Sequence, residues 1–166
     1  EPYPEQLVNM LRHRNRPVVV AQHAPPGVPI DAVRVDDEQI GRSGTEYLAS
    51  LGHRRILLLL SEPRSPLGEL RGQGWHDAMT AIGQTNLDEL VVDCNVVPGE
   101  NSLVKTYEHF TAWLNKPRPA FTAVFCVAWT GAIAGMRALR EHGLRLPDDV
   151  SLVSHGGEGY IGEPCA

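Results

Sequence analysis

Histidine and cysteine are the residue types of this 166-residue chain that could bind a metal ion or form disulfides, and their spacing favours neither. The seven histidines include no H-x-H or H-E-x-x-H pattern, the spacings that bring two imidazoles to one metal ion. Cys94, Cys126 and Cys165 are an odd number without C-x-x-C spacing, and Cys126 lies in an apolar run typical of a buried thiol. The sequence therefore predicts no metal site and a reducing compartment.

The patterns of nucleophilic and nucleotide-dependent enzymes are also missing. A serine hydrolase of α/β type needs a G-x-S-x-G turn, which does not occur. A dinucleotide enzyme needs G-x-G-x-x-G after its first strand, where this chain has Ser61-Glu62-Pro63-Arg64. Gly72-Gln73-Gly74 lies within a predicted helix and indicates close helix packing. We therefore expect no catalytic residues, no cofactor and no enzymatic activity.

Alternating strands and helices must position any functional side chains. Ile56–Leu60 is apolar on both faces, which predicts a parallel strand buried between helices. Further strands are predicted at Pro17–Ala21, Ala32–Val35, Leu90–Asp93, Ala123–Val127 and Val150–Ser154. One helix should begin at the capping residues Asp36 and Asp37 and end at Gly52. Further helices are predicted at Glu5–Arg14, from about Glu69 to Gly83, at Glu100–Leu114 and at Thr130–His142. Right-handed crossovers would make this series an α/β fold, a doubly wound parallel sheet in three α/β/α layers.

The apolar faces of two of these helices are also predicted. The helix after Asp37 should turn Ile40, Tyr47, Leu48 and Leu51 inward, with Gly41 and Gly44 allowing close backbone approach. The helix from about Glu69 should bury Leu70, Trp75, Ala78 and Ile82.

Ligands of a doubly wound sheet gather at the carboxyl ends of its strands. Three loops are expected at that edge, namely Ser61–Leu70, Ala128–Gly131 and His155–Tyr160. Amide donors at the helix starts favour anions or hydroxyl groups there.

Composition limits the partners of the chain. The net charge is −5 and the basic residues are scattered, so the sequence has no basic cluster suited to a nucleic-acid backbone. We expect that this chain alone does not bind DNA. No apolar stretch approaches the roughly 18 residues of a membrane span, and no leader-like segment opens the sequence, so we expect a soluble protein.

Four blocks of sequence, in the spacing expected, resemble the effector-binding core of the lactose/galactose repressor family of bacterial transcription regulators. They are Val33-Arg34-Val35-Asp36-Asp37, Leu51–Ile56 (LGHRRI), Leu70–Trp75 (LRGQGW), and Thr122–Phe125 followed by Ala132–Leu139 and Gly143–Val153 (GLRLPDDVSLV). Together they span nearly the whole chain.

The resemblance implies a fragment of a two-lobed effector domain with a periplasmic-binding-protein-like fold. Residues 1–34 would be the tail of the amino-terminal lobe, residues 35–155 the carboxy-terminal lobe, and residues 156–166 the start of the crossing back. A helix-turn-helix headpiece, absent from this chain, would bind DNA. The family implies a cytoplasmic homodimer in which a small sugar-like effector between the lobes controls operator binding by a population shift.

The resemblance also suggests effector-binding residues. Arg71 matches the family's arginine after the central strand, and its fork of donors suits paired hydroxyls or a carboxylate; a surface salt bridge is the alternative. Ala128-Trp129 stands where the family has Asn-Asp, and Ser154-His155-Gly156 where it has an aromatic residue and Asp. Trp129 could instead stack on a sugar ring or anchor an interface, while His155 or Glu158 could donate or accept a hydrogen bond, with a structural role open for His155.

Part of the dimer interface is expected on the helix Thr130–His142, at Ile133 and Met136. Two other functions stay open at this point. One is a periplasmic sugar-binding protein or receptor sensor lobe with the same fold, and the other is a dimerisation module that binds no effector.

Overall fold

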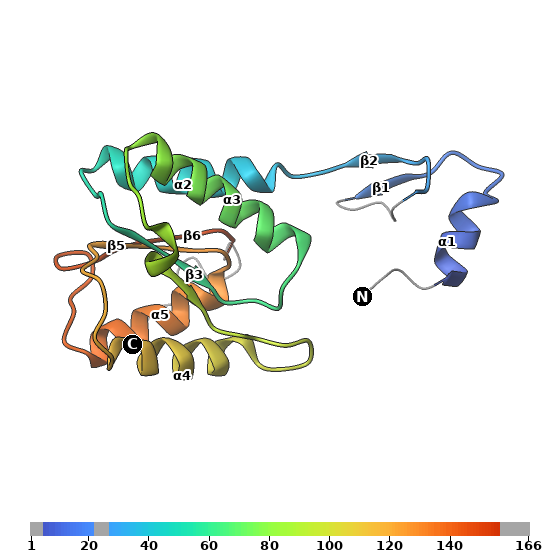
Figure 1. Cartoon of the computed structure of the whole chain (residues 1–166). Helices are drawn as coiled ribbons and strands as arrows, with labels where there is room; N and C mark the ends of the chain where they lie inside the picture. The colour runs from blue at the N-terminus through green and yellow to red at the C-terminus, as the bar shows by residue number, and fades with distance from the viewer. Residues whose placement is uncertain (1–4, 22–26, 157–166) are drawn as a thin grey trace. The chain divides into compact units, whose positions relative to one another are not determined.

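The chain divides into two compact units, Glu1–Asp36 and Asp37–Ala166, called the amino-terminal unit and the large unit below. The structure, a computed structural model, describes residues 5–21 and 27–156 (Figure 1).

The amino-terminal unit contains one helix and a two-stranded parallel sheet. Helix α1 (Glu5–Arg12) precedes β1 (Val19–Ala21) and β2 (Asp31–Val33), which pair with Val20 opposite Ala32. All three elements are shorter than the sequence predicted. Val28 is the one buried residue among those described in this unit. Two strands alone are marginally stable in water, so this unit has little core of its own.

The large unit is built on a four-stranded parallel sheet in the order β4-β3-β5-β6. Its strands are β3 (Ile56–Leu60), β4 (Val91–Asp93), β5 (Ala123–Cys126) and β6 (Ser151–Ser154). The two central strands β3 and β5 are buried on both faces, whereas the edge strand β6 is half-buried throughout. The all-apolar sequence of β3 thus reflects its central position, as predicted.

Helices cover both faces of this sheet. Helices α2 (Asp37–Ser50) and α3 (Pro66–Ala81) pack together on one face, and α4 (Ser102–Leu114) and α5 (Trp129–Glu141) on the other (Figure 1). A short 3₁₀ helix, η1 (Leu87–Leu90), leads into β4. The predicted doubly wound three-layer α/β fold is confirmed.

Two glycines let α2 and α3 pack with their backbones in contact. A Cβ atom on Gly41 would lie 1.9 Å from the carbonyl oxygen of Arg71, and one on Gly74 would lie 2.0 Å from that of Glu38. These are the close approaches predicted from Gly41 and from the Gly72-Gln73-Gly74 segment. Gly44 faces the ring of Phe125 in the sheet instead of a backbone.

The predicted apolar faces of α2 and α3 are partly wrong. Tyr47 is 58% exposed, Leu51 is 57% exposed and Leu70 is 41% exposed. The buried positions of α2 are Asp37, Gly41, Thr45 and Leu48. Backbone contact at the glycines fixes which face of α2 turns inward. This contact has a stronger effect than the number of apolar residues on the predicted face.

Helix α3 also begins one turn earlier than expected. Ser65 is its N-cap and accepts a hydrogen bond from the Gly68 amide at 3.2 Å, and Pro66 takes the first helical position. A serine followed by proline is a common helix start, because the cap satisfies one free amide and proline has none to satisfy.

Candidate functional site

The strand order defines the point at which the chain connections reverse direction across the sheet. The chain leaves β3 towards β4 through α3, and it crosses back to β5 on the other side of β3 through α4. The carboxyl ends of β3 and β5 therefore flank the switch point of the sheet, which is the usual ligand position in this architecture.

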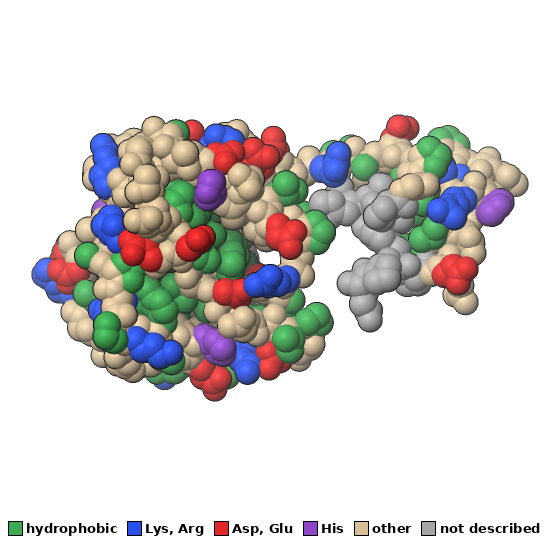
Figure 2. All heavy atoms as spheres, viewed as in Figure 1, with side chains coloured by type: hydrophobic (Ala, Val, Ile, Leu, Met, Phe, Trp, Pro, Cys, Tyr) green, Lys and Arg blue, Asp and Glu red, His purple; other side chains and the backbone are tan. Residues whose placement is uncertain are grey.

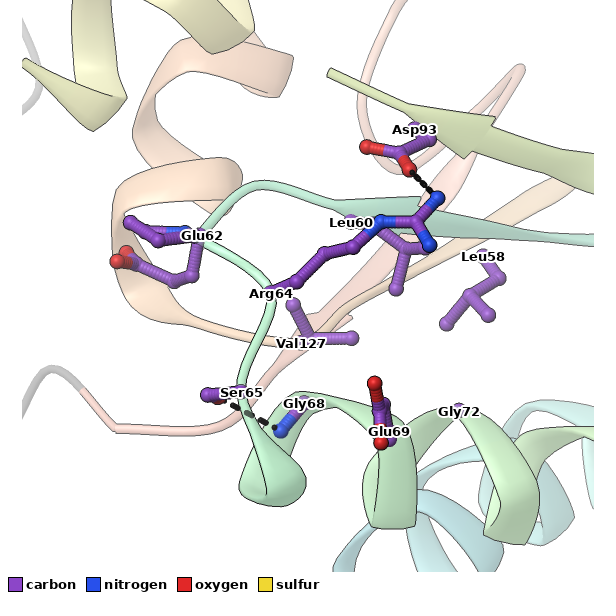
Figure 3. A pocket seen from close by; sticks show the side chains of 11 residues that line it. Leu58, Leu60, Glu62, Arg64, Ser65, Gly68, Glu69, Gly72, Asp93 and Val127 are labelled. Carbon is purple, nitrogen blue, oxygen red and sulfur yellow. Dashed lines mark hydrogen bonds and ion pairs between the residues drawn. The ribbon is translucent and has the colours of Figure 1, made fainter. Parts of the chain in front are cut away.

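A pocket of about 280 Å³ opens at these strand ends. We call it the strand-end pocket; it is lined by Leu58, Leu60, Glu62, Pro63, Arg64, Ser65, Gly68, Glu69, Gly72, Asp93 and Val127. Figure 3 shows the side chains of Leu58, Leu60 and Val127 facing the same space as Glu69. The pocket thus joins an apolar floor to polar side chains from the loop after β3, the first turns of α3 and the end of β4.

The charged groups of this pocket are mostly acidic. Arg64 donates to Asp93 at 3.0 Å, as Figure 3 shows, and its side chain is otherwise 84% exposed. Glu69 is an exposed residue in the first turn of α3. On the face of the large unit seen in Figure 2, hydrophobic side chains show between acidic and basic ones.

Glu62 ties the loop after β3 to both helices of the opposite layer. Its carboxylate accepts a hydrogen bond from the Thr130 hydroxyl at the start of α5 and one at 3.2 Å from Ser102 at the start of α4. Gly131 allows α5 to begin against this loop, because a Cβ there would lie 2.4 Å from the Ser61 hydroxyl oxygen. These contacts fix the rim of the switch point.

Arg71 lies in α3, and its side chain is 14% exposed. Its Nε atom donates to Asp37 Oδ1 at 2.8 Å, its Nη2 atom lies 2.6 Å from the same oxygen, and its Nη1 atom donates to the Val127 carbonyl at 2.8 Å. Asp37 is itself only 4% exposed. Arg71 therefore links the start of α2 to the end of β5 in a partly buried ion pair, and it is not among the residues that line the strand-end pocket.

Trp129 and His155 lie near the end of β6. A Cβ at Gly156, whose φ is +83°, would be 3.4 Å from Cδ1 of Trp129, so the indole lies directly beside this glycine. The His155 amide donates to the Cys126 carbonyl at 3.4 Å, and both Trp129 and His155 are half-buried. Neither lines the strand-end pocket. The fourth predicted effector residue, Glu158, lies outside the described residues.

Helix α5 carries the two residues expected at a dimer interface. Its buried face consists of Gly131, Ala132, Ala134, Gly135, Ala138 and Leu139. Ile133 and Met136 are half-buried, so part of each apolar side chain reaches the surface of this chain.

The structure gives no cluster of three or more His, Cys, Asp or Glu side chains suited to a metal ion within residues 5–21 and 27–156. Burial raises the pKa of the Cys94 thiol to about 12 and also raises that of Cys126. Such thiols stay protonated at neutral pH and are poor nucleophiles. Over the same residues, no helix is long and apolar enough to cross a membrane.

The charged residues of the strand-end pocket were missed by sequence reasoning. Glu62, Arg64 and Glu69 fall inside the loop Ser61–Leu70, which was expected at the ligand edge, but none was singled out. Asp93 ends β4, and the loop after that strand was not considered. Position was the available signal, since Asp93 is the last residue of β4 and Glu62 lies two residues after the neighbouring parallel strand β3.

The fold and the pocket together define an α/β lobe of the class that binds small molecules at the carboxyl ends of parallel strands. Residues 3–160 match the family of periplasmic binding proteins and sugar-binding domains of the LacI family, and the chain belongs to this family.

Individual relatives agree with this assignment. The HTH-type transcriptional repressor PurR of Vibrio vulnificus is 29% identical over 152 residues, which are 91% of this chain and 44% of the relative. A LacI-family regulatory protein of Chloroflexus aggregans superimposes with a TM-score of 0.74 at 27% identity, over 93% of this chain and 53% of that one. The complex of the regulator CelR with cellobiose matches with a TM-score of 0.68 at 25% identity, over 90% and 52%. The chain thus spans about half the length of these relatives.

Proposed function

We propose that this chain is the effector-sensing and dimerisation part of a cytoplasmic bacterial transcriptional regulator, without enzymatic activity. The observation that carries the proposal is the strand-end pocket at the switch point of a chain that belongs to the LacI family. The relatives described above are transcription regulators, which favours this function over that of a periplasmic binding protein.

In this proposal residues 35–155 are the carboxy-terminal lobe of the effector domain, residues 1–34 the tail of the amino-terminal lobe, and residues 156–166 the start of the crossing back. The thin core of the amino-terminal unit supports this division, because Val28 is the one buried residue among those described there. DNA binding belongs to a separate headpiece of the complete regulator, since a chain with a net charge of −5 is poorly suited to a phosphate backbone.

The effector is a small sugar-like molecule that binds in the strand-end pocket. Arg71, by its match to the family, and Trp129, His155 and Glu158, by the positions they occupy in the sequence, are proposed as further contacts. Arg71 acts mainly through the Val127 carbonyl, which it holds at the pocket wall. Binding shifts the regulator between two states with different affinity for its operator, and the effector must bind those two states with different strength.

The test is a thermal-shift screen of the 166-residue chain with pentoses, hexoses, cellobiose, nucleosides and purines. A ligand that binds the folded state raises the unfolding midpoint, and Gly72→Leu should remove this shift because the new side chain fills the pocket. Glu46→Leu, at an exposed position of α2, is the matched control and should keep the shift. If no compound stabilises the wild-type chain, the effector function is contradicted and the dimerisation module becomes the better proposal.

A further inference from the structure

We propose that the strand-end pocket takes an uncharged or positively charged small molecule with hydrogen-bond donors, and that it rejects phosphorylated or carboxylated ones. This inference rests on the proposed effector function and specifies the class of effector. Four observations on the charges, the helix start and the apolar floor support it.

The pocket itself is electronegative. Its lining contains the carboxylates of Glu62, Glu69 and Asp93 against the single guanidinium of Arg64, a formal charge of −2. That guanidinium already donates to Asp93 at 3.0 Å. An incoming anion would meet a net negative charge, whereas a hydroxyl or amine donor would meet acceptors, in particular the Glu69 carboxylate that faces the space in Figure 3.

Arg71, the family's polar contact, cannot serve this pocket as a free positive charge. Both its Nε and Nη2 atoms lie within 2.8 Å of one oxygen of Asp37, which is only 4% exposed. Removing the guanidinium from this partner to bind an anion would leave a buried carboxylate unpaired, which is strongly unfavourable. The positive charge of Arg71 is therefore already compensated inside the fold.

The start of α3 offers few free amide donors to an anion. Pro66 has no N–H group, the Gly68 amide donates to the Ser65 hydroxyl oxygen, and the Glu69 amide donates to the Ser65 carbonyl at 3.0 Å. The Glu69 carboxylate also lies in this first turn, where it offsets the partial positive charge of the helix end. The amide donors that usually bind an anion at a helix start are therefore mostly missing or already hydrogen-bonded within the chain.

The floor of the pocket favours a ligand with one apolar face. Leu58, Leu60 and Val127 face the same space, and the volume of about 280 Å³ lies near the lower end of the roughly 300–1,000 Å³ of ordinary ligand pockets. A single sugar ring or a nucleobase, with donors on one side and C–H groups or a ring face on the other, has matching chemistry.

The experiment compares matched pairs of probes by thermal shift on the 166-residue chain. The pairs are glucose and glucose 6-phosphate, and adenosine and adenosine 5′-monophosphate, with glucosamine as the cationic probe. Each is measured on the wild-type chain, on Glu69→Lys, which reverses one charge in the pocket, and on Glu46→Lys, which makes the same change at an exposed position of α2 outside it.

We expect an uncharged or cationic probe to stabilise the wild-type chain and the phosphorylated probes not to do so. Glu69→Lys should gain a rise of about 3 °C or more in the midpoint with a phosphorylated probe, and Glu46→Lys should gain none. The inference is overturned if a phosphorylated probe stabilises the wild-type chain as much as its uncharged partner, or if both lysine variants gain equally.

The other outcomes separate this inference from the proposed function. If no uncharged or cationic probe stabilises the wild-type chain while Glu69→Lys gains phosphate binding, the charge selectivity stands and the effector function is contradicted for these classes. If no probe stabilises any of the three chains, the pocket is not a ligand site and both proposals fail.

Discussion

Arg71 and Asp37 form an ion pair with 2.6 Å between Nη2 and Oδ1, and the same guanidinium donates to the Val127 carbonyl at 2.8 Å. One side chain thus connects the first residue of α2, the second turn of α3 and the segment that follows β5. Val127 lines the strand-end pocket and Arg71 does not, so this arginine affects the pocket through the position of Val127.

Loss of the buried carboxylate should destabilise the fold strongly. Asp37→Asn leaves the largely buried Arg71 guanidinium without its counter-charge, and we expect the free energy of unfolding to fall by about 3 kcal/mol. Urea denaturation measures this change. Glu38→Gln is the control on the same helix, since its ion pair with Arg42 is 43% exposed on the Glu38 side and should contribute little to stability. Equal losses in the two variants would contradict a buried role for the Asp37–Arg71 pair.

Two of the three glycines of α3, Gly72 and Gly74, should respond in opposite ways to alanine. In Gly74→Ala the new Cβ would lie 2.0 Å from the Glu38 carbonyl oxygen, so α2 and α3 must separate, and we expect a loss of more than about 2 kcal/mol in unfolding free energy. In Gly72→Ala the nearest atom is Leu58 Cδ2 at 3.6 Å, an ordinary contact, and the better helix propensity should stabilise the protein by up to about 1 kcal/mol. Urea midpoints of both variants decide the matter, and a tolerated Gly74→Ala would contradict backbone contact between the helices.

The layer order was predictable because each strand and helix has its own local signal. The run Ile56–Leu60 is apolar on both faces, and Gly52, Gly83 and Gly143, which follow helices, all have positive φ. The inward face of α2 was not predictable in this way. It depends on the close approach of Gly41 to the Arg71 carbonyl and of Gly74 to the Glu38 carbonyl. Hydrophobic periodicity along one segment carries no information about such contacts between two helices.

The position of the site in the fold could be predicted from the sequence, but most of the side chains that line it could not. Parallel strands end at one edge of the sheet, so the loop after β3 was correctly expected at the carboxyl ends of the strands. The partner of Arg71 could not be read from the sequence, because Asp37 lies 34 positions away and looks like an ordinary helix cap. Asp93 was missed because β4 is short and its downstream loop carries no distinctive pattern.

Low pH should reduce the stability of the folded state because Asp149 becomes protonated. The Arg145 side chain donates two hydrogen bonds to this carboxylate and the Arg145 backbone amide donates a third, and together they lower the pKa of Asp149 to about 2. Because the folded state prefers the charged form, its stabilisation is complete above the ordinary pKa of 3.8 and is lost as the pH falls towards about 2.

We therefore expect Asp149→Asn to be less stable than the wild-type chain at pH 6, with a difference that shrinks steadily below pH 4. Urea midpoints from pH 6 to pH 2.5 measure this. Asp88→Asn, at an exposed position of η1, is the control and should follow the wild-type curve. A difference between Asp149→Asn and wild type that stays constant with pH would show that charge on this carboxylate is not what stabilises the loop.

Helix α5 carries the proposed dimer surface. The buried face of α5 consists of small residues and Leu139, and it packs against α4 and the sheet. The half-buried Ile133 and Met136 offer apolar surface to a second copy of the chain. Ile133→Asp would place a charge in that contact, and we expect sedimentation velocity to show a monomer where the wild-type chain forms a dimer.

Val104→Asp is the matched control, because Val104 is a 51% exposed aliphatic residue of α4. It should remain dimeric, and far-ultraviolet circular dichroism should show both variants folded. A dimeric Ile133→Asp variant or a monomeric wild-type chain would each contradict the proposed interface on α5.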